Sequence, residues 1–132
     1  MGTATECRYR PGQVWDYKTR PFEPLSTLTI LKVWAAPNED YIVVHIAIEE
    51  LLFTRANGEV VDVSLAHTVI TPEALDQSVT ELVRESSPIP DFSKEYASWE
   101  KESGAAFERT VAEVVTTLEE AWRYGVRLEP EQ

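Results

Sequence analysis

Residues 11–34 have the sequence Pro-Gly-Gln-Val-Trp-Asp-Tyr-Lys-Thr-Arg-Pro-Phe-Glu-Pro-Leu-Ser-Thr-Leu-Thr-Ile-Leu-Lys-Val-Trp, and this stretch decides the fold. A Pro-Gly turn leads into residues 13–19, whose side chains alternate between two sides as in a half-buried strand. Residues 20–24 contain two prolines and cannot continue a strand, so we expect a loop that exposes Arg20 and Phe22 at a rim. The rest of the stretch alternates again. It therefore predicts two strands joined by a proline-bounded loop.

Two further strands are predicted along the chain. Residues 41–54 are apolar at nearly every position at first, as in a central strand covered on both faces, and become mixed at Glu49 and Glu50, where we expect a bulge or a sheet edge. Residues 56–58, Ala-Asn-Gly, predict a three-residue hairpin loop whose glycine takes the left-handed conformation. The return strand at 59–70 places one stripe of side chains on one face: Val61, Val63, Leu65, His67 and Val69.

From Thr71 the hydrophobic period becomes helical. Thr71 is a good N-cap and Pro72 suits the first helical position, where its missing N–H costs nothing. An apolar stripe then predicts a helix through residue 83: Leu75, Val79, Leu82 and Val83. Residues 86–90, Ser-Ser-Pro-Ile-Pro, predict a short stiff linker.

Two more helices are predicted in the last third of the chain. The first spans about residues 91–103 and ends at Gly104. Residues 105–109 favour a short strand that returns to the sheet. Thr110-Val-Ala-Glu113 matches a capping box and opens the last helix, which Gly125 ends.

These elements predict an α+β fold. The sheet is expected to be a twisted antiparallel β-sheet, or a small barrel of the SH3-like kind, with about three packed α-helices. At 132 residues we expect a single domain over residues 1–132, with frayed ends at 1–10 and 128–132.

The composition favours an acidic cytoplasmic protein. The chain carries 23 Asp and Glu against 12 Lys and Arg, a formal net charge of −11, which argues against nucleic-acid binding and suits a basic protein partner. Cys7 is the only cysteine, so an internal disulfide is excluded and a reducing compartment is favoured. No stretch approaches the roughly 20 apolar residues that cross a bilayer, so no membrane partner is expected.

A resemblance rests on residues 12–21, Gly-Gln-Val-Trp-Asp-Tyr-Lys-Thr-Arg-Pro, and on residues 26–33, Ser-Thr-Leu-Thr-Ile-Leu-Lys-Val. The chain resembles a family of small uncharacterised bacterial proteins that share this opening motif. The similarity continues through residues 44–46, 66–67 and 75–79. It implies a bacterial origin and a single-domain architecture, and it brings no activity and no functional residue to this chain.

Any acid–base chemistry would start with His45 and His67, whose ordinary pKa values lie near neutrality. If the three-residue loop sets the register, His67 faces Ala47 and His45 faces Val69, which places both histidines on one face at about 7–8 Å between Cα atoms. A two-residue turn would put them on opposite faces instead. On one face, the pair could suit a shared water, a metal completed by a carboxylate, or an anionic ligand; ordinary strand histidines are the other interpretation. Their spacing matches no metal motif, so no metal or cofactor is predicted.

The aromatic side chains offer a second candidate site. Three of them could wall a pocket with one cation at its mouth to orient an anionic ligand: Trp15, Tyr17 and Trp34, with Arg20. They could equally belong to the core, as Trp99 and Trp122 are expected to do because they fall at helical spacing. Adjacent acids such as Glu119 and Glu120 on a helix are typical of a solvated face.

No nucleophile motif, phosphate-binding glycine loop or dinucleotide-binding motif is present in the sequence. The leading hypothesis is therefore a non-enzymatic protein-interaction module, of the immunity or inhibitor type, that binds a basic protein through its acidic surface. One alternative is a small-ligand-binding protein or metal-assisted enzyme with its site at His45 and His67. A second alternative is a homodimer in which a sheet edge or an aromatic patch forms a structural interface.

Overall fold

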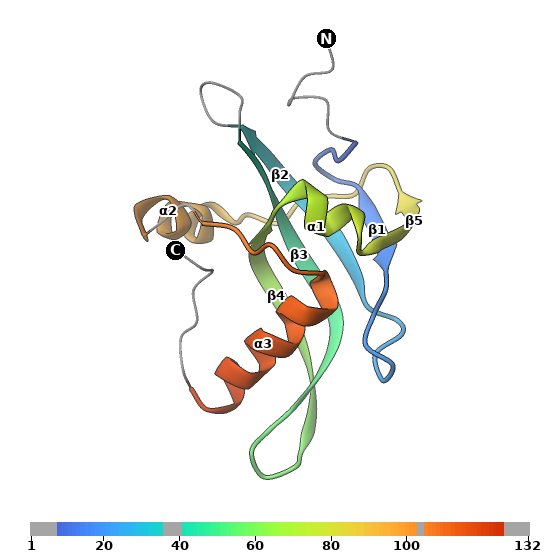
Figure 1. Ribbon diagram of the computed structural model, residues 1–132, viewed down its shortest axis with the longest axis vertical. Helices are drawn as coiled ribbons and strands as arrows, with labels where there is room; N and C mark the ends of the chain where they lie inside the picture. Colours follow the sequence, from blue (N-terminus) through green and yellow to red (C-terminus); the bar gives the residue numbers. More distant parts are fainter. Residues whose placement is uncertain (1–7, 36–40, 103–104, 126–132) are drawn as a thin grey trace.

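A five-stranded antiparallel sheet lies at the centre of the structure (Figure 1). The computed structural model describes residues 8–35, 41–102 and 105–125. The strands are β1 (Val14–Tyr17), β2 (Thr27–Ala35), β3 (Ile42–Thr54), β4 (Val60–Ile70) and β5 (Val79–Arg84), and the helices are α1 (Pro72–Asp76), α2 (Ser93–Glu102) and α3 (Val111–Arg123). In space the strands are ordered β4-β3-β2-β1-β5, so β4 and β5 are the two edges. The predicted α+β class with an antiparallel sheet is confirmed, and the sheet is open rather than a barrel.

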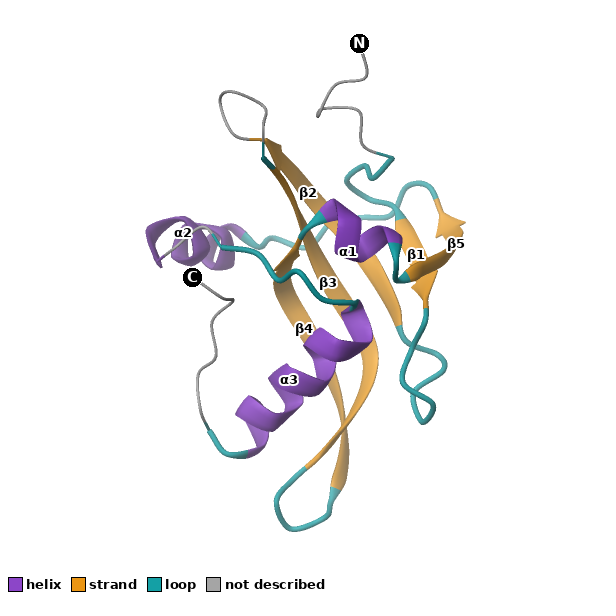
Figure 2. Cartoon of the chain, viewed as in Figure 1, coloured by secondary structure: helices purple, strands orange, loops and turns teal. Residues whose placement is uncertain are grey.

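The two faces of the sheet carry different layers. On the first, here called the main face, α1 and α3 pack on a large core that includes Trp15, Ile46 and Phe53 (Figure 1). On the second face, α2 packs over a smaller cluster around Trp99. The loop from β5 crosses the second face to reach α2 (Figure 2). Ser87 in this loop donates its N–H to Gly12 O at 2.8 Å.

The β3–β4 hairpin has the predicted three-residue loop. Arg55 N–H donates to Glu59 O at 2.7 Å, and Gly58 has a φ of 92°, the left-handed conformation that glycine adopts readily. The register at the loop pairs Thr54 with Val60, and further along the hairpin it pairs His45 with Val69, as predicted. Both histidines therefore lie on one face.

Two bulges interrupt this hairpin between its ends. Ile46 pairs with Thr68 and Ile48 with Leu65, so Ala47 alone lies opposite two residues of β4. A second irregularity falls at Glu49 and Glu50, where a bulge was expected, and Glu50 has a φ of 60°.

The predicted single-face stripe of β4 is wrong, because the first bulge divides it between the two faces. Three of its side chains pack on the core of the main face: Val61, Val63 and Leu65. Val69 instead packs on the second face with Trp99. An extra residue on one strand reverses the side-chain alternation, so a stripe read along β4 changes face at the bulge.

The predicted helix through residue 83 is wrong in its second half. α1 ends at Asp76, and β5 then pairs with β1, with Trp15 opposite Leu82. Ser78 helps to end the helix, because its hydroxyl donates to Ala74 O at 2.9 Å and accepts the Val111 N–H at 2.9 Å. The β-branched residues of β5 are good strand formers, and pairing satisfies the backbone of β1 along its outer edge.

The remaining helix predictions agree with the structure. α2 lies within the predicted 91–103, and α3 begins with the capping box of Thr110 and Glu113. The expected short strand at 105–109 is a single parallel bridge from Phe107 to Ile70.

Residues 8–10, expected to be frayed, are part of the packed structure. Tyr9 is buried, its hydroxyl lies 2.6 Å from Asp76 Oδ1, and its ring lies edge-on to Trp15. Cys7, Gly104 and the expected frayed end at 128–132 lie outside the described residues.

Candidate functional site

His45 and His67 form a hydrogen-bonded pair on the second face of the sheet. His45 Nδ1 lies 2.7 Å from His67 Nε2, and the rings are nearly parallel, with centroids 5.0 Å apart. His45 comes from the central strand β3 and is fully buried, whereas His67 comes from the bulge of β4 and is half-buried. The hairpin register therefore brings the two rings into direct contact, closer than the predicted diagonal spacing implied.

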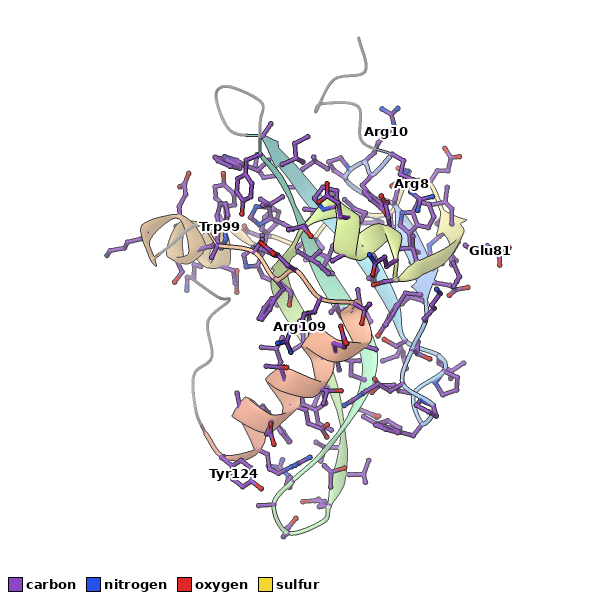
Figure 3. The ribbon with its side chains drawn as sticks, in the orientation of Figure 1. Arg8, Arg10, Glu81, Trp99, Arg109 and Tyr124 are labelled. Atoms are coloured by element: carbon purple, nitrogen blue, oxygen red, sulfur yellow. The ribbon has the colours of Figure 1, made fainter. Side chains whose placement is uncertain are left out.

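Aromatic side chains of α2 and the loop before it enclose the pair. Phe92 stacks on His67 at 5.8 Å, and Trp99 lies edge-on to His45 at 4.6 Å. Tyr96 lies 5.2 Å from His45. In Figure 3, Trp99 on α2 lies at the left of the view and Glu81 on β5 at the right, toward the opposite edge of the sheet. Since α2 contacts the histidines through these rings, the pair forms part of the surface on which α2 is seated.

The electrostatic environment keeps the pair neutral at pH 7. Burial, and then the positive potential of His67 and Lys32, lowers the pKa of His45 to about 3. Lys32 is the direct cross-strand partner of His45 on β2, and its ammonium lies over the Tyr96 ring at 5.4 Å. Burial also lowers the pKa of His67, while nearby Glu95 acts to raise it. A neutral pair shares one proton through the short hydrogen bond, with one ring as donor and the other as acceptor.

The geometry of the pair does not resemble a metal site. One nitrogen of each ring is directed at the other, and their hydrogen bond leaves neither of these two nitrogens available to an ion. His45 Nε2 is buried without a hydrogen-bond partner among the described residues. In the described part of the chain, no group of three or more His, Cys, Asp or Glu side chains could hold a metal ion.

A small recess lies beside the pair. It has a volume of about 290 Å³ and is lined by Lys32, Pro90, Asp91, Phe92, Ser93 and Tyr96. Phe92 and Tyr96 form part of its wall and also contact the histidines. The recess therefore offers aromatic surface, the ammonium group of Lys32 and the carboxylate of Asp91, and the histidines are not among its lining residues.

The predicted aromatic pocket does not form, because its members lie on different sides of the sheet. Trp15 and Tyr17 are buried in the core of the main face. Trp34 packs on the second face, edge-on to Trp99 at 5.8 Å. Of the three aromatics, only Trp34 shares a face with His45.

Arg20 was expected at an exposed rim, and the structure corrects this, since only 8% of its surface is exposed. Its guanidinium donates to Glu23 Oε2 and to Glu119 Oε1, both at 2.7 Å. Phe22, in the same loop, is 51% exposed as expected. Glu119 was expected to be solvated and is buried, while its neighbour Glu120 is exposed. Two carboxylates hold the guanidinium in place, so Arg20 is not free to bind an anion.

Acidic side chains on the open part of the second face were not predicted from the sequence. Asp16 lies directly opposite Glu81 on β5 and opposite Thr27 on β2, and Thr27 lies opposite Glu49 on β3. Directly paired residues share a face. Asp62, opposite Leu52, lies on the same face of the hairpin. We call Asp16, Glu49, Asp62 and Glu81 the acidic sheet face. In the sequence these acids are isolated positions of β1, β3, β4 and β5, and only the strand register places them on one face.

None of these four carboxylates forms an ion pair with a base in the described residues. By contrast, the exposed pair Arg55–Glu59 and the buried pair Arg20–Glu119 show that other acids of the protein are matched. The acidic sheet face is therefore a surface of unbalanced negative charge.

Comparison with protein-family models, with curated proteins and with solved structures finds no match to this chain. The resemblance carried by residues 12–21 stays a prediction. No helix in the described part of the chain is long and apolar enough to cross a membrane.

Proposed function

We propose that this protein binds a basic protein partner through the acidic sheet face, as an immunity or inhibitor protein would. The observation that carries the proposal is the direct opposition of Asp16 and Glu81 across β1 and β5. Like charges opposite each other in a sheet destabilise it by a few tenths of a kcal/mol to about 1 kcal/mol. A cationic partner would convert this repulsion into attraction.

Charge and position support the same proposal. The net charge of −11 favours attraction of a basic surface over long distances. α1 and α3 pack on the other side of the sheet, so they leave the acidic sheet face uncovered. Because its carboxylates are solvent-exposed or half-exposed, binding through them should weaken as salt rises.

The test captures proteins from the lysate of the source organism with the wild-type protein and with two variants of equal net charge. The first carries Asp16→Lys and Glu49→Lys on the acidic sheet face. The second carries Glu108→Lys and Glu120→Lys, which are exposed and lie away from that face, and it has the same net charge. Mass spectrometry would quantify what each variant retains at 50 and 200 mM salt.

We expect the wild type and the control variant to retain the same basic protein at low salt. The sheet-face variant should retain at least tenfold less of that protein. Retention that is equal for both variants would show that net charge alone attracts the partner. Retention of no basic protein by the wild type would contradict the proposed function.

A second candidate is a small-ligand site in the recess beside the histidine pair. The observation that favours it is the combination of the Lys32 ammonium with the aromatic wall of Phe92 and Tyr96. An aromatic carboxylate such as benzoate fits this chemistry. Titration of the protein with benzoate, followed by NMR, should shift the signals of Lys32 and Tyr96; unchanged signals up to millimolar concentrations would exclude this class of ligand. Histidine signals unaffected by added Zn²⁺ would exclude the metal-assisted alternative.

A further inference from the structure

The outer edge of β4 carries unpaired backbone groups. In an antiparallel pair, successive residues point their N–H and C=O groups alternately toward the partner strand and away from it. Arg55 and Glu59 form a bonded pair at the loop, so Val60, Asp62 and Ser64 direct their backbone groups away from β3. All three residues are exposed, and no described residue accepts or donates a hydrogen bond at this edge.

Elsewhere the protein covers comparable backbone. Beyond residue 68, the edge of β4 is met by Phe107, which donates to Val69 O at 2.9 Å and accepts from Thr71 N–H at 3.0 Å. The end of β3 is also covered, along the edge that faces away from β4. There the side chains of Glu23 and Glu119 accept the N–H groups of Leu52 and Thr54. The outer edge over residues 60–64 has no such cover.

Apart from the charge of Asp62, the edge lacks the usual protection against strand addition. Residues 60–67 contain no lysine and no proline, and the first bulge of β4 comes only after Leu65. Proteins commonly place such features on exposed edges because an unprotected edge pairs with other chains. Val61, Val63 and Leu65 alternate along it and are only half-buried on the main face. The edge thus offers both backbone groups and apolar side chains to an added strand.

We propose that β4 accepts an extended segment of the basic partner as a sixth, antiparallel strand of the sheet; this rests on the proposed function. The residues of that segment that bond to Val60, Asp62 and Ser64 lie on the second face, as the acidic sheet face does, and they are basic. The residues between them lie on the main face beside Val61 and Val63, and they are apolar. The partner segment therefore alternates basic and apolar residues.

Charge favours this occupant over a second copy of the chain. Two copies joined along β4 would bring together two chains of net charge −11 and would merge their acidic sheet faces into one. Such a dimer increases repulsion, whereas an alternating basic strand places a base opposite Asp62 on the second face.

The experiment uses the full chain and an octapeptide of alternating Val and Lys, acetylated and amidated at its ends. Two matched peptides carry the same number of backbone N-methyl groups, on every lysine or on every valine. In the proposed pairing the lysine N–H groups bond to β4 and the valine N–H groups point to solvent. NMR titration would give the affinities, and hydrogen exchange would report the amides of Val60, Asp62 and Ser64.

We expect the parent and valine-methylated peptides to bind with similar affinity and to slow exchange at those three amides. The lysine-methylated peptide should bind at least tenfold more weakly. Ser64→Pro, which removes one outward N–H from an edge strand, should weaken the parent peptide similarly. The methylated peptides test the same point without any change to the protein.

Other results would overturn the inference. Equal binding of all three peptides, lost in the Asp16→Lys/Glu49→Lys variant, would leave the acidic sheet face as the binding surface and exclude strand addition. Absence of binding by any peptide, with a partner still captured through the acidic sheet face, would also exclude it. Slow exchange at Val60, Asp62 and Ser64 without peptide, together with a dimer in sedimentation, would assign the edge to a second copy.

Discussion

Arg20 and Glu119 lie 99 positions apart in the chain, and their side chains meet in a buried ion pair with a 2.7 Å N–O distance. The pair stands where β3 continues past the last residue that it pairs with on β2. There, Glu23 accepts the Leu52 N–H at 3.0 Å and Glu119 accepts the Thr54 N–H at 2.7 Å. Side chains thus take the place of a neighbouring strand.

The backbone carbonyls of the same segment are matched in the same way. Arg20 Nη2 donates to Leu52 O at 3.3 Å, and Arg123 Nε donates to Thr54 O at 2.8 Å. Two acids and two arginines therefore reproduce the alternating donors and acceptors of a strand. Through these bonds, the loop after β1 and the end of α3 are both attached to the projecting hairpin.

Replacing Arg20 with leucine should destabilise the protein by about 3–5 kcal/mol, because it leaves the buried carboxylate of Glu23 without its ion-pair partner and leaves that of Glu119 with Arg123 alone, at 3.3 Å. Urea unfolding would measure the loss. Arg55→Leu is the matched control, since it breaks the exposed pair with Glu59 and should cost less than about 1 kcal/mol. Similar losses for the two variants would show that the network contributes no more than a surface pair.

The histidine pair should make stability depend on pH. The pKa of His45 is lowered from 6.5 to about 3 in the folded protein, so below pH 6.5 the unfolded chain binds more protons than the folded one. The free energy of unfolding should therefore be fully retained above about pH 7 and should fall by about 2 kcal/mol for His45 between pH 7.5 and pH 5.

Denaturant unfolding at a series of pH values would measure this slope. His45→Phe keeps an aromatic ring in the cluster and removes the titrating group, so its stability should change less over the same range. A variant with the wild-type slope would assign the pH dependence to other groups.

The register of the β3–β4 hairpin could be predicted because it depends on local chemistry. Residues 56–58 form a three-residue loop in which Gly58 supplies the left-handed conformation, and this loop sets the pairing of Thr54 with Val60. His45 still lies opposite Val69 because the two bulges, one in each strand, offset each other. The capping box at Thr110 is equally local. Features that depend on a few neighbouring residues could therefore be predicted from the sequence.

Features that depend on distant contacts were not. Arg20 is buried because Glu119 reaches it from the last helix, and nothing near Arg20 in sequence indicates that partner. Val79 and Leu82 fit a helical stripe as well as a strand, and pairing with β1 decides between the two. A shared face for the histidines followed from one of the two turn types considered, and their enclosure by α2 depends on a loop that crosses the sheet.

Two glycines offer a matched test of backbone packing. Gly12 and Gly58 have φ values of 95° and 92°, which strain any other residue. A Cβ on Gly12 would lie 3.2 Å from Ser87 O, whereas one on Gly58 would meet nothing within 4 Å. Gly58→Ala should cost about 1–2 kcal/mol, and Gly12→Ala should cost more, because it also separates the chain from the loop that leads to α2.

Thermal or urea unfolding of the two alanine variants would check this order. Equal costs would mean that the loop at Ser87 moves away from the added methyl group without loss. A larger cost for Gly58→Ala would contradict the close approach at Gly12.

Trp99→Ala should release α2 from the second face. Trp99 is buried, packs on His45 and donates its indole N–H to Ala105 O at 2.6 Å, so its truncation should cost about 3–5 kcal/mol. Water would then reach His45, and its pKa should rise from about 3 toward 6.5, because burial is the main cause of its lowering. NMR titration of the histidine ring signals would measure that rise.

Trp122→Ala is the matched control, since Trp122 is 36% exposed on α3 and contacts Phe53 on the main face. It should lower stability less and leave the pKa of His45 unchanged. A pKa of His45 that stays low in Trp99→Ala would show that Lys32 and His67, rather than the cover of α2, keep this ring neutral.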